Sequence, residues 1–212
     1  RRNDGKDPKL LPLMTFPFLF DNVYVDVPCS GDGTFRKAPS LWRKWNASTG
    51  AALQPLQLQL LLAALDACKP GGIVVYSTCS LNPVENEQVV AHALTKTRHH
   101  VELLDAHARA RQVGCFLSLR RGLAEMSGSD KKEKKECLSG LGGSSSNGKR
   151  FHVSMLQRCV RVLPHDNDTG GFFVSLIRKL YPADSSRGSA QRHSKVKAKV
   201  GSRTKRLNEH GL

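Results

Sequence analysis

Short apolar runs and longer helical patterns alternate along the first third of the chain. The β-branched run at 22–27 predicts a strand that ends at Pro28. Residues 53–68 are rich in leucine and predict a helix with Pro55 in its first turn, which the Pro-Gly-Gly sequence at 70–72 terminates. Because the leucines of this segment nearly encircle the helix axis, we expect the helix to be well buried.

A second strand and a second helix are predicted directly afterwards. The apolar run Ile73–Ser77 is typical of a strand that is buried on both faces. The next helix is predicted to begin after Asn82, which is a good N-cap residue. Pro83 suits the first helical position, and Glu85 stands at the position of a capping box.

Two closing strands are predicted at 159–163 and 171–177, separated by a turn rich in Pro, Asp, Asn and Gly. The order of strand, helix, strand, helix and two final strands indicates an α/β layered fold with a mostly parallel sheet. The last two strands are expected to form an antiparallel pair at one edge of that sheet.

Composition separates a folded region from segments that lack a core. Residues 1–20 are predicted to be irregular because they contain three prolines, and 127–148 resemble a low-complexity, disordered insertion. Residues 183–212 contain eight Lys and Arg against two Asp and Glu and predict a disordered basic tail. The folded domain is therefore expected within 21–180.

The net charge of +15 over 212 residues favours a polyanionic partner, either nucleic acid or an anionic membrane surface. No run approaches the roughly 18 apolar residues of a membrane span, and no secretory signal precedes the first strand, so no membrane partner is expected. The basic tail favours a nuclear or nucleolar location, with the cytoplasm as the alternative. None of the six cysteines forms a C-x-x-C pair, so no metal site is expected.

A cysteine follows each of the first two predicted strands. Cys29 lies just past Val27, and Cys79 lies just past Ser77. Ligands of open α/β sheets bind beyond the carboxyl ends of the strands, so both thiols should face one crevice if the two strands are neighbours. The positive end of the helix after Cys79 should favour its thiolate, which is the nucleophilic form. The alternative for each residue is a buried structural cysteine.

These residues belong to longer motifs that resemble a known family. The segments 26–34 (DVPCSGDGT) and 76–87 (YSTCSLNPVENE) resemble the two cysteine motifs of the Sun/Fmu RNA cytosine-5 methyltransferases. The segments 161–165 (RVLPH) and 169–173 (TGGFF) resemble the closing motif of that family. The eukaryotic transfer-RNA branch is the most similar one.

The resemblance implies the C-terminal part of a Rossmann-like domain that transfers a methyl group from S-adenosylmethionine to carbon 5 of cytosine in RNA. It implies that Cys79 adds to carbon 6 of the base and that Cys29 assists the release of this adduct. It places Asp26 at the junction of cofactor and base, where the alternative is a strand-end residue that only makes a turn hydrogen bond. Transfer RNA is the favoured partner.

Four basic residues surround two tryptophans in the segment 36–45. They could bind RNA through its phosphates and through stacking of its bases. Equally, the tryptophans could be core residues and the charges a solvated face. The basic residues are Arg36, Lys37, Arg43 and Lys44, and the tryptophans are Trp42 and Trp45.

The cofactor site of the resembled family uses a glycine-containing loop after the first strand and an acidic residue at the end of the second. Neither is found here, because Gly31-x-Gly33 is followed by Phe35-Arg36 and fails the G-x-G-x-x-G pattern. We therefore expect the chain to begin after the first three strands of the domain and to lack most of the cofactor pocket. The rival hypothesis is a non-catalytic RNA-binding relative that uses charge alone.

Overall fold

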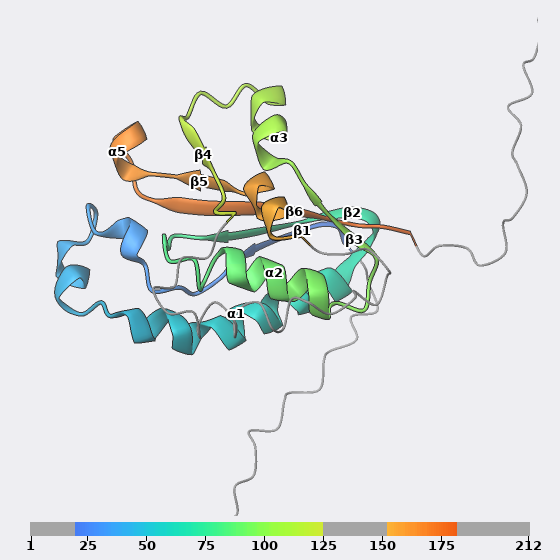
Figure 1. Ribbon diagram of the computed structural model, residues 1–212, viewed down its shortest axis with the longest axis horizontal. Coiled ribbons are helices and arrows are strands. Elements are labelled where there is room, and N and C mark those ends of the chain that lie inside the picture. The colour runs from blue at the N-terminus through green and yellow to red at the C-terminus, as the bar shows by residue number, and fades with distance from the viewer. Residues whose placement is uncertain (1–19, 125–151, 182–212) are drawn as a thin grey trace, which may run out of the picture. The chain divides into compact units, whose positions relative to one another are not determined.

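The computed structural model describes residues 20–124 and 152–181, which form a single six-stranded sheet with helices on both faces (Figure 1). Residues 1–19, the predicted insertion at 127–148 and the predicted tail at 183–212 lie outside the described residues. Phe20, which was expected to end an irregular segment, is the first residue of a strand. The strands are β1 (Phe20–Asp26), β2 (Cys68–Thr78), β3 (Val101–Leu104), β4 (Leu119–Arg121), β5 (Val160–Val162) and β6 (Phe172–Lys179).

Four α-helices and three short 3-10 helices connect the described strands. The 3-10 helices are η1 (Asp32–Thr34), η2 (Pro39–Arg43) and η3 (Val153–Arg158). The α-helices are α1 (Ala47–Ala67), α2 (Glu87–Lys96), α3 (Ala106–Gln112) and α5 (Pro164–Asn167).

The strands run in the order β1-β2-β6-β5-β4, and β3 pairs with the far end of β6. Only β1 and β2 pair in parallel, whereas β6 is antiparallel to β2, β3 and β5, and β4 is antiparallel to β5. The expectation of a mostly parallel sheet is therefore wrong for the pairings among the described strands. The reason is topological: β2, β3 and β5 share one direction, but β6 enters between them in the opposite direction.

The predicted antiparallel pair is present as β5 and β6, but it does not lie at an edge. Val160–Val162 pairs with Phe172–Val174, and the other side of β6 pairs with β2 over six residues. Because β6 lies inside the sheet, its side chains alternate between two separate sets of core contacts, one on each face.

Two apolar cores lie on opposite faces of the sheet. Phe173 and Ile177 of β6 belong to the larger core, which α1 and α2 cover. Phe172 and Leu176 point to the other face, where they pack against the small core around Ala106 of α3. Figure 1 shows α1 and α2 on one side of the sheet and α3 on the other.

Helix α1 begins six residues before the predicted start. Asn46 caps it, because its side-chain oxygen accepts a hydrogen bond from the Thr49 amide at 2.9 Å, so Pro55 lies inside the helix instead of in its first turn. The helix is also less buried than expected. Leu61 is fully buried, whereas Leu56 and Leu60 are 44% and 37% exposed, because the described residues cover only one face of α1.

Helix α2 begins at Glu87, five residues after the predicted cap at Asn82. Asn82 instead closes a local turn, in which its Oδ1 accepts a hydrogen bond from the Val84 amide at 3.0 Å. The Asn82 amide donates to Ser80 Oγ and not to Glu85, so the predicted capping box is not formed. Glu85 turns into the interior, where tertiary hydrogen bonds replace the local one.

The segment from β3 to β4 carried no sequence prediction. It contains two strands of four and three residues and the seven-residue helix α3. Elements this short show at most about two periods of a helical or alternating pattern, so tertiary pairing with β6 and β5 defines the strands.

Candidate active site

The two cysteines that follow β1 and β2 face each other, as the sequence predicted for neighbouring strands. Asp26 pairs in register with Ser77 at the ends of the parallel strands, so the loops that follow leave the sheet side by side. The Sγ atoms of Cys29 and Cys79 are 3.1 Å apart. Both thiols are half-buried. The two sulfurs are close enough to form a hydrogen bond with each other.

The pKa of Cys79 is lowered from 9.0 to about 7, chiefly by the hydrogen bond from the Cys29 thiol. Burial and the nearby carboxylate of Asp26 oppose this effect but do not outweigh it. The same contact raises the pKa of Cys29, which therefore keeps its proton. The expected cause, a helix N-terminus just after Cys79, is wrong, because α2 begins eight residues later with an acidic residue, Glu87.

Replacement of Cys29 by alanine is expected to raise the pKa of Cys79 toward the ordinary value of 9.0. At pH 7 the thiolate fraction should fall from about one half to about 1%, and alkylation should slow roughly fifty-fold. The measurement is the pH dependence of iodoacetamide labelling of Cys79, followed by peptide mass spectrometry. Cys29→Ser, which keeps a donor, is the matched control and should retain part of the shift. A midpoint that stays near 7 in Cys29→Ala would show that another group stabilises the thiolate.

Two glycines let three backbone segments meet beside the thiols. The Gly33 amide donates to the Cys79 carbonyl at 3.0 Å, and the Gly171 amide donates to the Gly33 carbonyl at 2.6 Å. A Cβ on Gly33 would lie 2.6 Å from the Cys79 oxygen, and one on Gly171 would lie 2.9 Å from Gly33 Cα. Gly171, which directly precedes β6, thus anchors the start of that strand to the cysteine loops.

Glu85 is the centre of a hydrogen-bond cluster that the sequence analysis did not identify as part of the site. Its Oε1 accepts from the Ser30 amide at 2.7 Å and from Gln57 Nε2 at 3.1 Å. Its Oε2 accepts from the hydroxyls of Ser30 and Ser80 at 2.5 and 2.8 Å. The signal that could have found it is Gln57, a polar residue in helical spacing with the buried Leu61 and Leu65.

Arg161 of the predicted closing motif is also part of this region. Its Nε donates to Glu87 at 2.7 Å and its Nη1 donates to the Leu81 carbonyl at 2.8 Å, and both side chains of the ion pair are almost fully buried. Removing one partner of such a pair leaves a buried, uncompensated charge. The closing motif therefore holds the loop after Cys79 against β5.

Asp26 lies at the carboxyl end of β1, where its side chain is exposed and accepts a hydrogen bond from Ser77 Oγ at 2.8 Å. Its negative charge acts on Cys79 and raises that pKa, which places the carboxylate near the thiols. Asp32 fixes the neighbouring loop by accepting a hydrogen bond from the Leu81 amide at 2.7 Å.

The four predicted RNA-binding residues are all exposed, but their contacts differ. Arg36 is already paired with Asp168 and the Pro164 carbonyl. Lys37 lines the same pocket as Cys79. Arg43 and Lys44 lie at the end of η2, and neither forms an ion pair with another described residue. Their tryptophans are not core residues: Trp42 is 71% exposed and Trp45 is 36% exposed, and both pack edge-on against Phe35.

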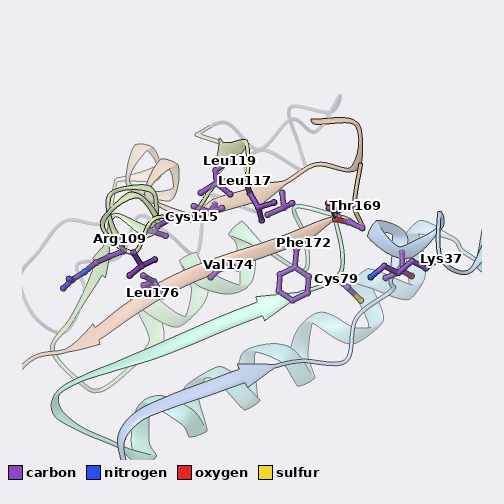
Figure 2. A pocket seen from close by; sticks show the side chains of 18 residues that line it. Lys37, Cys79, Arg109, Cys115, Leu117, Leu119, Thr169, Phe172, Val174 and Leu176 are labelled. Carbon is purple, nitrogen blue, oxygen red and sulfur yellow. Dashed lines mark hydrogen bonds between the residues drawn. The ribbon is translucent and has the colours of Figure 1, made fainter. Parts of the chain in front are cut away.

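An open pocket with a volume of about 610 Å³ runs along the sheet from α3 to the cysteines. Its walls are mostly apolar and come from α3, β4, β5 and β6. Figure 2 shows Cys79 and Lys37 at one end of the pocket, with Thr169 close by, and Arg109 toward the other end. A ligand in this pocket could therefore reach the sulfur of Cys79.

Among residues 20–124 and 152–181, no group of three or more His, Cys, Asp or Glu side chains is placed to hold a metal ion. No helix in the same ranges has the length and apolar character needed to cross a membrane.

Structural comparison defines the class of protein. A methyltransferase homologue of known structure from Pyrococcus horikoshii superposes on the chain with a TM-score of 0.51 at 30% identity, over 77% of this chain and 40% of that chain. The expected α/β class is confirmed, and the fold is that of a Rossmann-like methyltransferase domain.

Sequence comparison identifies the family. The chain belongs to the family described as 16S rRNA methyltransferase RsmB/F, whose sequence profile matches residues 2–178. The multisite-specific tRNA:(cytosine-C(5))-methyltransferase trm4b of Schizosaccharomyces pombe is 42% identical over 178 residues, which are 78% of this chain and 25% of that protein. The corresponding enzyme of Saccharomyces cerevisiae is 38% identical, over 82% of this chain and 25% of that protein. The chain thus spans about a quarter of the length of these relatives.

Proposed function

We propose that this chain carries the catalytic thiols of an S-adenosylmethionine-dependent RNA cytosine-C5 methyltransferase, with Cys79 as the nucleophile. The observation that supports it is the contact of 3.1 Å between Cys29 and Cys79, which lowers the pKa of Cys79 to about 7. About half of Cys79 is then a thiolate at neutral pH. Membership of a methyltransferase family and the names of the two yeast relatives favour this reaction.

The reaction needs a thiolate because carbon 5 of cytosine is a poor nucleophile. The Cys79 thiolate adds to carbon 6, and the electron pair of the 5,6 double bond becomes available at carbon 5. S-adenosylmethionine, when bound, supplies the methyl group that carbon 5 takes up. The proton on carbon 5 must then leave, so that the double bond can form again and expel Cys79 as a thiolate.

Cys29 acts in the second half of this sequence. Before the reaction, the Cys79 thiolate raises the pKa of Cys29 and keeps it protonated. Once Cys79 is bonded to carbon 6 its sulfur carries no charge, so this effect disappears and Cys29 can lose its proton to solvent. Its thiolate then accepts the proton from carbon 5 and allows the adduct to break down.

Asp26 is the residue of this chain that we propose for the junction of cofactor and base. One of its oxygens accepts a hydrogen bond from the Ser77 hydroxyl, while the rest of the exposed carboxylate is accessible to a ligand at the end of β1. It can accept a hydrogen bond from the exocyclic amino group of cytosine as positive charge develops there. The positive charge of the cofactor would also be favoured next to this carboxylate.

RNA is the proposed partner, with transfer RNA favoured by the names of the yeast relatives. Lys37, Arg43 and Lys44 are exposed cations in the same chain segment as the exposed Trp42, which suits contacts to phosphates and to an unstacked base. A nuclear or nucleolar location remains a prediction from the basic charge.

The test uses the longest natural form of the protein, unmodified transfer and ribosomal RNA transcripts, and S-adenosylmethionine with a labelled methyl group. We expect labelled 5-methylcytosine in the transfer RNA, identified by nucleoside mass spectrometry. Binding of RNA without any methylation would overturn the proposal and favour a non-catalytic RNA-binding relative. Methylation of ribosomal RNA alone would keep the chemistry and change the substrate.

A further inference from the structure

We infer that Glu85 is a positioning residue that joins the two cysteine loops and thereby sets the distance between Cys29 and Cys79. The catalytic meaning of this inference rests on the proposed function, but the geometry does not. Glu85 lies in the turn before α2 and does not contact either sulfur in any described hydrogen bond. It therefore acts through the residues beside them.

The residues next to the two cysteines are the ones that Glu85 binds. Ser30 directly follows Cys29, and both its amide and its hydroxyl donate to the Glu85 carboxylate. Ser80 directly follows Cys79, and its hydroxyl donates to the same oxygen that binds the Ser30 hydroxyl. A single carboxylate oxygen thus holds both chain segments one residue away from the reacting sulfurs.

All acceptor positions of this carboxylate are used. A carboxylate has about four lone-pair sites, and Glu85 accepts four hydrogen bonds, two on each oxygen. The side chain is fully buried, and none of the ion pairs among the described residues includes it. Its position is therefore determined by these donors, so a change in one loop is transmitted to the other.

Helix α1 supports the cluster from the opposite side. Gln57 Nε2 bridges Glu85 and the carbonyl of Pro28, the residue before Cys29, at 3.1 and 2.9 Å. Gly50 leaves room for the carboxylate, because a Cβ at this position would lie 2.7 Å from Glu85 Oε2. Cys29 is consequently held on both sides along the chain, through Pro28 and through Ser30.

A polar cluster of this kind serves a purpose that an apolar core would not. Ser30 and Ser80 carry short hydroxyl side chains whose directional hydrogen bonds fix the backbone on either side of the site. Removing the carboxylate takes the acceptor away from two hydroxyls and one amide, and the loops must rearrange to replace it. The sulfur–sulfur contact, which depends on both loops, is then expected to be lost.

The experiment measures the thiol geometry with dibromobimane, which cross-links two neighbouring thiols, in the longest natural form of the protein. Peptide mass spectrometry quantifies the Cys29–Cys79 cross-link. We expect Glu85→Ala to lower its yield at least tenfold, and Glu85→Gln to restore most of it, because the hydroxyls can turn and accept from the amide. Asp105→Ala, which removes the cap of α3 but touches neither cysteine loop, is the control for destabilisation and should cross-link like the wild type.

Two further readouts keep the inference falsifiable if Glu85→Ala does not fold. Gly50→Ala should lower the cross-link yield while keeping every donor side chain, because its methyl group would clash with Asn82 Nδ2 and lie 2.7 Å from Glu85 Oε2, and must displace both. In the methylation assay, Glu85→Ala and Gly50→Ala should lower kcat at least tenfold with little change in the KM for RNA. An unchanged cross-link in Gly50→Ala, or a Glu85→Gln protein that cross-links as poorly as Glu85→Ala, would overturn the inference. If the wild-type protein methylates no RNA but Glu85→Ala and Gly50→Ala still lose the cross-link, the geometric inference is sustained and the proposed function is contradicted instead.

Discussion

Cys79→Ala is expected to abolish methyl transfer, with a loss in kcat of at least about a thousandfold. Without a thiolate at carbon 6, carbon 5 of cytosine stays a poor nucleophile, and RNA and cofactor can bind but not react. Cys29 is not an evident substitute, because its Sγ lies 3.1 Å from the Sγ of Cys79 and so does not occupy the attacking position. The fold should persist, since the Cys79 side chain is only half-buried.

The assay is single-turnover transfer of a labelled methyl group to the preferred RNA, with circular dichroism to verify the fold. Cys115→Ala is the matched control, because Cys115 is an exposed free thiol that also lines the pocket, and it should retain near wild-type turnover. Substantial residual turnover in a folded Cys79→Ala protein would remove Cys79 as the nucleophile.

Cys29→Ala is expected to behave differently, because it blocks the breakdown of the covalent adduct and not its formation. Cys79 can still add to carbon 6 and carbon 5 can still be methylated, but no neighbouring base accepts the proton that must leave. The variant should therefore accumulate a covalent protein–RNA complex that survives denaturing electrophoresis. Formation should be slow at neutral pH, since the Cys79 pKa no longer benefits from the Cys29 thiol, and faster at alkaline pH.

The double variant, with both cysteines replaced by alanine, is the control and should form no complex. The cross-linked peptide, after digestion of the RNA, should contain Cys79. A complex that forms in Cys79→Ala and not in Cys29→Ala would mean that the two roles are reversed.

The candidate site was predictable wherever it depended on residues next to a strand. The β-branched run before Cys29 and the apolar run before Cys79 each identify a strand end, and β1 and β2 are indeed parallel neighbours. Their carboxyl ends must then lie at one edge, which is why the prediction that both thiols face one crevice, made on the condition that the two strands are neighbours, agrees with the structure. The roles of Cys29, Cys79 and Asp26 stay predictions until the variants are measured.

The hydrogen bonds behind the thiols were not predictable in the same way. Asn82 and Glu85 satisfy the local rule for a capping box, but Glu85 gains three hydrogen bonds from distant segments and one from Ser80 in place of one local hydrogen bond. The distant donors are 28 residues away at Gln57 and 55 residues away at Ser30, whereas Ser80 is 5 residues away. Glu85 does not follow its local propensity to form a capping box, because a buried carboxylate must be fully hydrogen-bonded.

By itself, the sequence determined the α/β class, both strand ends that carry a cysteine, and the closing strands, because these depend on periodicity and on breakers within a few residues. Only the tertiary structure decided that β6 enters between β2 and β5, which makes most pairings antiparallel, and that α2 begins at Glu87. It also decided that the Cys29 thiol, and not a helix end, lowers the pKa of Cys79. The physical reason is common to all three: strand partners and buried polar groups are chosen by contacts between distant segments, which no window of the sequence contains.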